Sequence, residues 1–326
     1  MSCLKVDALK AAEILKENDD FYILTHSNPD GDTIGSGYAL NAVLKVMGKR
    51  VKVLCGDPIP PKLEFLKTDE STCFEPKTIV AVDVADERLL GALKERFTGK
   101  IDLCIDHHAS NTGYAKYLYL EAESASCCEC VFEVVKHLNV EITPEIASAL
   151  YLGMATDTGC FKYSSTTPRT HRFAAELMEL GANFGDINRS FFDTKSKARL
   201  ELERAVLDSI EYLYDGKFAA VTITREMIES AGCEQTDLDS VSSLPREIEG
   251  VLIGATIKEQ PDGRLRVSLR THEPYDASEI GKAFGGGGHK RAAGCEFKCS
   301  LQEAKKALFS KIGELLEERK WTDLYC

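Results

Sequence analysis

Thr25-His26-Ser27-Asn28-Pro29-Asp30-Gly31-Asp32 lies between a short apolar segment, 21–24, and a longer one, 33–47, whose apolar residues recur with the period of an α-helix. The longer segment stops at Gly48, a residue typical of helix C-termini. A strand, a polar loop and a helix in this order form the first part of a βα unit. In open parallel sheets such loops line the binding crevice at the carboxyl ends of the strands. We therefore expect an α/β domain with its functional site at this loop.

The rest of the first half continues this alternation. Short segments rich in β-branched residues predict strands at 51–54, 79–82 and 101–105. Apolar periodicity predicts helices at 126–137, 144–155 and 168–180, and an amphipathic helix over the first ten residues. Strands that alternate with helices predict a doubly wound, mainly parallel sheet.

The second half has a different pattern. A charged segment, 195–212, predicts a connecting helix, and strands are expected at 218–224, 251–258 and 264–270. The last two strands are joined by a turn at Pro261-Asp262-Gly263. A glycine-rich loop at 285–288 and a helix at 301–319 follow. We thus expect one domain over 1–185, a helical linker over 186–215 and a smaller α+β domain over 216–326.

Length and composition are those of a globular protein with two domains. The chain has 326 residues, of which 44% are hydrophobic and 28% charged, and one core seldom serves such a length. No apolar run reaches the roughly 20 residues of a membrane helix, and no signal peptide is recognisable. We therefore expect a cytoplasmic protein without membrane contacts. The net charge of −12 works against the binding of long nucleic acids, because these require many Lys and Arg contacts to phosphate, and no long duplex is expected as a partner.

The twelve cysteines do not form a disulfide pattern, since they are spread along a chain without an export signal. Cys127, Cys128 and Cys130 cluster on a predicted helix, but no second pair stands at zinc-finger spacing. A structural zinc site is therefore the weaker interpretation. Reduced and mostly buried thiols are the favoured one.

Three predicted strands and one predicted helix end in residues that can bind metals. The set comprises His26, Asp30, Asp32, Asp83, Asp106, His107, His108 and Asp157. Because the carboxyl ends of parallel strands meet at one edge of a sheet, these side chains are expected to lie together. Crowded carboxylates repel one another unless cations offset their charges. The pattern favours a metal site over a structural polar cluster.

The types of ligand indicate the metal. Oxygen and imidazole ligands without thiolates suit Mn²⁺ or Mg²⁺, and Zn²⁺ or Fe²⁺ less well. Two ions about 3.5–4 Å apart activate a water and stabilise the charge of an in-line phosphoryl displacement. We predict a metal-dependent phosphoesterase with two divalent cations, of which Mn²⁺ is the expected ion and Mg²⁺ the alternative. The six ligands would be His26, Asp30, Asp32, Asp83, His107 and Asp157.

Four features of the sequence resemble the motifs of the DHH phosphoesterase family and follow in the family's order. They are the His-x-x-x-Asp-x-Asp of 26–32, the isolated Asp83, Asp106-His107-His108 and the later Asp157. The resemblance implies one ion bound by His26, Asp30 and Asp83, and a second bound by Asp32, Asp83, His107 and Asp157. Asp83 would then bridge the two ions.

The resemblance also implies catalytic roles, two of them for residues that do not bind metal. His108 would face the substrate phosphate and stabilise its charge. Asp106 is expected to orient a neighbouring imidazole, as carboxylates often do beside metal-bound histidines. Asp83, Asp106 and His108 would then be the catalytic residues.

Gly285-Gly286-Gly287-Gly288-His289-Lys290-Arg291 is the second informative segment. Successive glycines let backbone N–H groups converge on an anion, with cations beside them. A flexible loop is the alternative, but the small residues that follow, 292–294, suit close packing. On the preceding strand Arg264, Arg266 and Arg270 alternate and so share one face. Either this face is solvated or part of it binds an anion, and we favour Arg270 for that contact.

This segment resembles the Gly-Gly-Gly-His element of the DHH-associated C-terminal domain, so the resemblance extends over nearly the whole chain. It implies that Gly286, Gly287, Gly288 and His289, together with Arg270 and His108, bind substrate. The group of the family with the same two domains comprises nanoRNases and pAp phosphatases. Its members hydrolyse RNA oligomers of a few residues and 3′-phosphoadenosine 5′-phosphate (pAp), and some relatives cut linear diadenylate. One departure is that the stretch Ser124-Ala125-Ser126-Cys127-Cys128-Glu129 stands where relatives usually carry Ser and Thr.

We therefore expect hydrolysis of short oligoribonucleotides to mononucleotides, or of pAp to AMP. A RecJ-like single-strand exonuclease should be larger and more basic, and a pyrophosphatase of the same superfamily would lack the glycine loop. A non-catalytic nucleotide sensor would need no paired metals. The partners expected are short RNA or small nucleotides, and a homodimer stays open.

Overall fold

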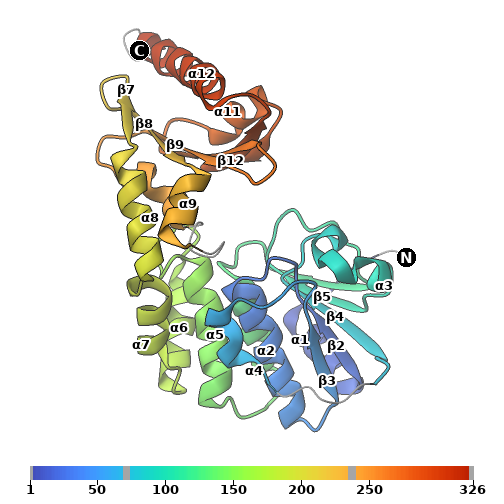
Figure 1. Ribbon diagram of the computed structural model, residues 1–326. Coiled ribbons are helices and arrows are strands. Elements are labelled where there is room, and N and C mark those ends of the chain that lie inside the picture. Colours follow the sequence, from blue (N-terminus) through green and yellow to red (C-terminus); the bar gives the residue numbers. More distant parts are fainter. Residues whose placement is uncertain (1–2, 69–73, 234–239, 323–326) are drawn as a thin grey trace. The chain divides into compact units, whose positions relative to one another are not determined.

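The structure of the protein is a computed structural model that describes residues 3–68, 74–233 and 240–322. The chain forms two compact units, Met1–Thr194 and Lys195–Cys326, each with its own sheet (Figure 1). Residues 186–194 of the expected linker therefore belong to the first unit, and the remainder belongs to the second.

The first unit is built on a parallel sheet of six strands. Their order is β1 (Leu4–Lys5), β6 (Tyr117–Leu120), β5 (Leu103–Asp106), β4 (Thr78–Val82), β2 (Phe21–Leu24) and β3 (Val51–Leu54), and every neighbouring pair is parallel. After β3 the chain crosses to the other side of β2 and winds in the opposite direction. The edge between β2 and β4 is thus the switch point at which open parallel sheets bind ligands.

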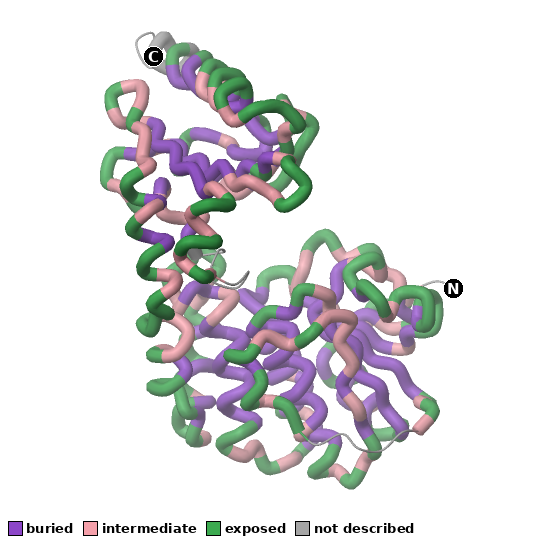
Figure 2. Tube along the Cα trace, in the orientation of Figure 1, coloured by how far each residue is buried: buried purple, intermediate pink, exposed green. Residues whose placement is uncertain are grey.

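Helices cover the two faces of this sheet unequally. One face packs in a large core with α1 (Ala8–Glu17), α2 (Gly31–Val46), α4 (Cys127–Lys136), α5 (Pro144–Asp157), α6 (Pro168–Glu179) and α7 (Phe184–Asn188), the last followed by η3 (Arg189–Asp193). The other face is covered by η2 (Glu87–Leu93) and α3 (Lys94–Phe97), while η1 (Pro61–Leu66) lies beside α2. β2 and β4 are buried along their whole length (Figure 2). The predicted α/β class and parallel sheet are confirmed.

The second unit carries a mixed sheet. Its order is β11 (Gly287–His289), β12 (Ala292–Phe297), β10 (Leu265–Thr271), β9 (Ile253–Glu259), β8 (Phe218–Ile223) and β7 (Glu211–Leu213), and only β8 and β9 pair in parallel. One side packs against α11 (Ala277–Ala283) and α12 (Leu301–Thr322), and a smaller core joins β8 to α8 (Lys197–Asp208), α9 (Arg225–Ala231) and η4 (Ser240–Glu247). The expected smaller α+β unit is confirmed. None of the helices in the described ranges has the length and apolarity needed to cross a bilayer.

Several element boundaries differ from the predictions. The helix expected over the first ten residues begins only at Ala8, capped by Asp7, because Leu4 and Lys5 pair with β6 as an edge strand. α2 begins two residues early, since the Asp30 side chain accepts the first free N–H groups of the helix. The helix expected over 195–212 ends at Asp208, and Tyr212 lies in β7.

The helices α2, α4 and α5 approach one another where glycines leave no side chain between them. A Cβ on Gly35 would lie 2.5 Å from the carbonyl oxygen of Ala149. A Cβ on Gly153 would overlap the Sγ of Cys128 and lie 2.6 Å from Oδ1 of Asp32. The backbone of α5 thus sits directly against a side chain that was predicted to bind metal.

We expect Gly153→Ala to lower the free energy of unfolding by about 1–3 kcal/mol, because the added methyl overpacks this contact. Gly185→Ala in α7 is the matched control, since no atom lies within 4 Å of a Cβ there. That change should be neutral or stabilise by up to about 1 kcal/mol through helix propensity. Urea unfolding midpoints measure both, and equal midpoints for the two variants would contradict the close contact.

Candidate metal centre

The loop after β2 supplies the first candidate ligands. The Nδ1 of His26 lies 2.8 Å from the carbonyl oxygen of Ser27, so that its Nε2 points to the carboxylates. That Nε2 is 3.7 Å from Oδ1 of Asp30 and 3.4 Å from Oδ2 of Asp83. Asp30 caps α2, and its Oδ1 accepts hydrogen bonds from the N–H groups of Asp32 and Thr33, each at 3.0 Å.

Asp32 is fixed by another helix. Its two carboxylate oxygens accept backbone N–H groups from the first turn of α4, at 2.6 Å from Cys127 and 2.9 Å from Cys128. Its side chain is 1% exposed. A helix N-terminus favours negative charge, so the backbone N–H groups of α4 offset part of the cost of burying this carboxylate. Because the contacts come from the backbone, the departure from Ser and Thr at these two positions does not remove them.

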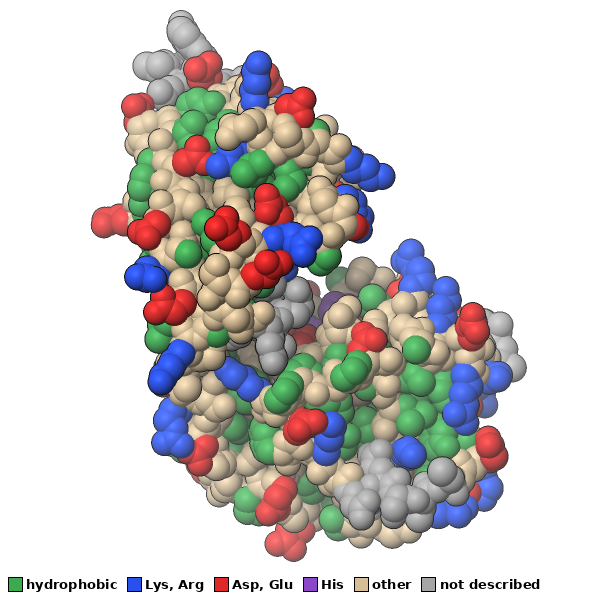
Figure 3. All heavy atoms as spheres, in the orientation of Figure 1, with side chains coloured by type: hydrophobic (Ala, Val, Ile, Leu, Met, Phe, Trp, Pro, Cys, Tyr) green, Lys and Arg blue, Asp and Glu red, His purple; other side chains and the backbone are tan. Residues whose placement is uncertain are grey.

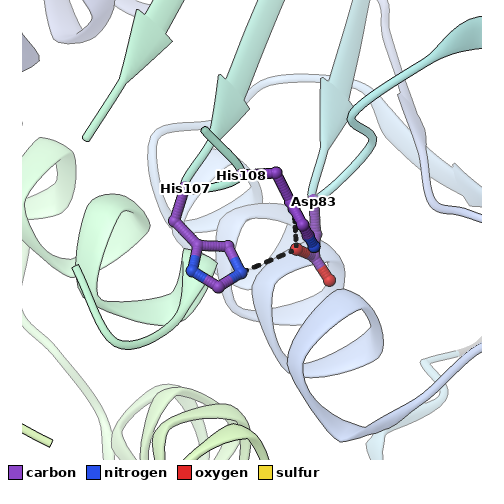
Figure 4. A group of neighbouring side chains, drawn as sticks. All are labelled: Asp83, His107 and His108. Carbon is purple, nitrogen blue, oxygen red and sulfur yellow. Dashed lines mark ion pairs between the residues drawn. The ribbon is translucent and has the colours of Figure 1, made fainter. Parts of the chain in front are cut away.

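Asp83 occupies the centre of the site. It follows β4 in the left-handed backbone region, at φ 60°, and its N–H donates to the carbonyl of Ile105 at 3.0 Å. Its Oδ1 lies 3.5 Å from Nε2 of His107 and 3.6 Å from Nδ1 of His108, as Figure 4 shows. Its side chain is 3% exposed. Asp83 therefore lies between the histidines of two different loops.

His107 connects Asp83 to the end of α5. Its Nδ1 lies 3.2 Å from the carbonyl oxygen of Ser124, which leaves Nε2 for the centre. Nε2 is 3.8 Å from Oδ2 of Asp32 and 3.6 Å from Oδ2 of Asp157. The end of α5 therefore reaches the same edge as the strands.

Asp106 and His108 form a hydrogen-bonded pair beside these ligands. Oδ1 of Asp106, which is fully buried, accepts from the backbone N–H of His107 at 2.8 Å and lies 2.8 Å from Nδ1 of His108. Oδ2 accepts from the side chain of Asn111 at 2.6 Å. The imidazole that Asp106 orients is thus that of His108, which is 42% exposed.

The electrostatics of the centre favour added positive charge. Burial, followed by the charge of Asp83, raises the pKa of Asp32 well above its ordinary value. Burial also raises the pKa of Asp157 to about 6. Burial opposes protonation of His26, but hydrogen bonds to Asp30 and Asp83 outweigh it and raise its pKa to about 11. The hydrogen bond to Asp106 raises the pKa of His108 to about 9.

The donor set fits divalent cations. The described residues contain three groups whose ligand atoms lie within 4.8 Å of one another: His26, Asp30 and Asp83; Asp32, His107 and Asp157; and Asp83, His107 and His108. Oδ1 of Asp83 is buried without a hydrogen-bond partner, which is costly unless a cation takes that place. The ligands are oxygen and imidazole nitrogen, the types that suit Mn²⁺ and Mg²⁺. The structure thus brings together all six predicted ligands.

The described cysteines agree with the interpretation as reduced thiols. Cys127, Cys128 and Cys130 are free and fully buried, and burial raises the pKa of each thiol. No thiol belongs to a metal-ligand group in the described ranges.

Apart from His108, the residues predicted to bind substrate lie in the second unit. Arg270 pairs with Ala292, which pairs with the backbone of His289, so that these positions align across three strands; the side chain of His289 lies outside the described parts. Leu265, Val267 and Leu269 are buried whereas Arg266 is exposed, which confirms the alternation on β10. Arg264 is bound by Asp262 and Glu296.

Close packing against the neighbouring backbone requires glycine at two positions of this segment. A Cβ on Gly286 would overlap the carbonyl oxygen of Gly294, and one on Gly288 would lie 2.6 Å from that of Ala292. The N–H groups of Gly285 and Gly286 already donate to carbonyls of α11. Gly287 and Gly288, expected in a loop, pair with β12 as β11. A cavity of about 610 Å³ lies beside Gly285, Gly286 and Gly287, with Arg266 in its wall.

Sequence reasoning missed three contacts that shape the centre. Asn111 stands five residues after Asp106, and a short polar residue so close to the motif is a signal that could have been used. The Ser124 carbonyl and the N–H groups of α4 are backbone groups without any signature in the sequence.

Comparison with known proteins supports the resemblance. Residues 20–154 match the DHH family, N-terminal domain, and residues 215–318 match the DHHA1 domain. The chain is 33% identical over 94% of its length to the bifunctional oligoribonuclease and PAP phosphatase NrnA of Thermus thermophilus, covering 93% of that protein. It is 23% identical over 89% of its length to the protein of the same name in Bacillus subtilis, again covering 93% of it.

Solved structures show the same fold. An exopolyphosphatase-related protein from Bacteroides fragilis superposes with a TM-score of 0.85 at 25% identity, over 93% of this chain and 94% of that one. RecJ of Thermus thermophilus in complex with Mn²⁺ superposes with a TM-score of 0.57 at 16% identity, over 92% of this chain and 53% of RecJ.

We expect Asp83→Asn to abolish binding of both ions. Mn²⁺-dependent hydrolysis should fall by more than roughly 100-fold, which is the loss expected when a residue that only hydrogen-bonds to a metal ligand is replaced. The metal-free variant should melt at a higher temperature than the wild type, because one of the crowded negative charges is removed. Calorimetric titration with Mn²⁺ and a thermal melt in EDTA measure these effects.

Asp208→Asn, at the exposed end of α8, is the matched control and should change neither quantity. Two ions bound to Asp83→Asn with unchanged affinity would refute the central position of this carboxylate.

Proposed function

This chain is a phosphoesterase of the DHH family with a C-terminal DHHA1 domain, and we propose that it hydrolyses short oligoribonucleotides such as pApA to mononucleotides and pAp to AMP. The observation that carries the proposal is the convergence of six candidate ligands, Asp83 among them, at the switch point of the sheet. The 33% identity to a bifunctional oligoribonuclease and PAP phosphatase, over almost the whole of both chains, supports the same substrates.

We propose that His26, Asp30 and Asp83 hold one divalent cation and that Asp32, Asp83, His107 and Asp157 hold the second. Mn²⁺ is the proposed ion and Mg²⁺ the alternative, and the oxygen and nitrogen ligands support both. When bound, such a pair supplies an activated water and offsets the charge that develops on a phosphoryl group.

The residues of the chain then have separate tasks. Asp106, held by Asn111, binds Nδ1 of His108 and thereby leaves the other ring nitrogen to donate to a phosphoryl oxygen. Placed there, an imidazolium would stabilise the charge of the transition state more than that of the substrate. The Ser124 carbonyl fixes the ring of His107 in the same way, with Nε2 available as a ligand.

Substrate length is proposed to depend on the second unit. Arg270, Gly286, Gly287, Gly288 and His289 would anchor a terminal phosphate or nucleotide. The strand register that aligns Arg270 with His289 through Ala292 supports a contribution of both positions to one binding site. On the face shown in Figure 3, acidic and basic side chains are interspersed, which agrees with small rather than long nucleic acids. The free thiols among the described cysteines agree with a reducing, cytoplasmic environment.

A substrate panel in Mn²⁺ and in EDTA tests the proposed function. RNAs of two to five residues, pAp and linear diadenylate should be hydrolysed in Mn²⁺ only, while long single strands and pyrophosphate should be poor substrates. Preference for long strands would favour an exonuclease of the RecJ type. Binding of nucleotides without turnover would favour a sensor.

We expect Arg270→Ala to raise the KM for pAp about tenfold or more, since charge-assisted hydrogen bonds to phosphate each contribute about 1.5–3 kcal/mol. Arg264→Ala, directly before the same strand, is the matched control, because Asp262 and Glu296 already bind its guanidinium. Steady-state kinetics with both variants measure the difference. Equal KM values for the two variants would contradict the assignment of Arg270 to the substrate site.

A further inference from the structure

The chain makes an unusual turn directly after the candidate ligand Asp157. Gly159, Cys160 and Phe161 have φ values of 57°, 59° and 62°, so three consecutive residues lie in the left-handed region. Only glycine adopts this region readily, and residues with a Cβ persist there when the surroundings hold them. Such backbone is concentrated at functional sites.

Hydrogen bonds and ring contacts hold the turn in place. The N–H of Cys160 donates to the carbonyl of Ala155 at 2.7 Å, and that of Phe161 donates to the hydroxyl of Thr158 at 2.9 Å. The carbonyl of Thr158 accepts the N–H of Tyr163 at 3.0 Å. The ring of Phe161 packs between Tyr151 and His171, at centroid distances of 5.8 and 5.4 Å. These contacts stabilise the turn in this conformation.

The turn determines where the ring of Tyr163 lies. A Cβ on Gly159 would overlap this ring, with Cε2 at 2.8 Å, so the ring rests on the glycine two residues beyond Asp157. Tyr163 is nevertheless 51% exposed. Asp157 itself has 35% of its side chain exposed, more than Asp32 or Asp83. A half-exposed aromatic ring thus rests on the turn that directly follows the most accessible ligand of the second group.

We propose that Tyr163 is a specificity-determining residue, whose ring stacks on the base of the nucleotide that carries the phosphate to be cleaved. Aromatic rings bind bases of single-stranded nucleic acids with little sequence preference, because every base offers a flat face. Close contact with Gly159 immobilises the ring before the substrate arrives, which reduces the entropy lost on binding. This inference rests on the proposed function, since it requires a nucleotide at the metal centre.

The test compares Tyr163→Phe, Tyr163→Leu and Tyr163→Ala with the wild type, using pApA and Mn²⁺. Phenylalanine keeps the ring, and leucine keeps an apolar cover over Gly159 without a ring. We expect near wild-type kinetics for phenylalanine and a KM raised about 5-fold or more for leucine and alanine, with kcat changed less than twofold. Thermal melts report any loss of folding.

A second measurement does not depend on turnover. A dinucleotide containing 2-aminopurine, bound in Ca²⁺, should lose fluorescence on stacking with the wild type and Tyr163→Phe but not with Tyr163→Leu. Phe65→Ala is the matched control, because Phe65 is 58% exposed and lines an apolar cavity with Pro144 at the opposite end of α5 from Asp157. It should change neither KM nor fluorescence.

The outcomes separate the two proposals. If the wild type hydrolyses pApA and Tyr163→Leu matches it in KM and in fluorescence, the ring serves only as a cover and the inference is overturned. If the wild type turns over no nucleotide in Mn²⁺, the proposed function itself fails.

Discussion

Repulsion between carboxylates at a buried edge is the constraint on which the first unit depends. Asp32 and Asp83 are 1% and 3% exposed, and Asp30 and Asp157 lie in the groups around them. Water has little access to the charges of Asp32 and Asp83, and backbone dipoles offset part of the negative charge at this edge. α4 directs two N–H groups at Asp32, and α2 directs two at Asp30. Oδ1 of Asp83 has no hydrogen-bond partner, so a cation is most needed at this position.

The histidines at this edge follow one rule. Each has its Nδ1 beside an oxygen acceptor, namely the carbonyl of Ser27 for His26, the carbonyl of Ser124 for His107, and Asp106 for His108. The contact fixes the ring and determines which nitrogen faces the centre. Two neighbours with identical side chains, His107 and His108, therefore present different surroundings. The carbonyl of Ser124 leaves Nε2 of His107 facing the candidate ligands, whereas the carboxylate of Asp106 raises the pKa of His108.

Close packing holds these groups at the required distances. α2 and α5 pack closely against each other at Gly35 and Gly153. This contact brings the end of α5 to the edge of the sheet where the strands end in candidate ligands. The left-handed turn that follows Asp157 then holds the exposed ring of Tyr163 against Gly159, two residues beyond that ligand. In the second unit Gly286 and Gly288 allow β12 to approach closely, so the glycine run is required by packing as well as by any anion it binds.

The sequence by itself determined the α/β class, the strands that end in ligands and the set of six ligand candidates, because strand patterns and polar residues at strand ends are local features. It also indicated the alternating face of β10, since a period of two is set by backbone geometry. Tertiary structure alone decided that Asp32 is held by α4, that Asp106 orients His108, and that the glycine run forms a strand. These results depend on backbone groups brought together from distant parts of the chain, and a backbone N–H or carbonyl is the same in every sequence.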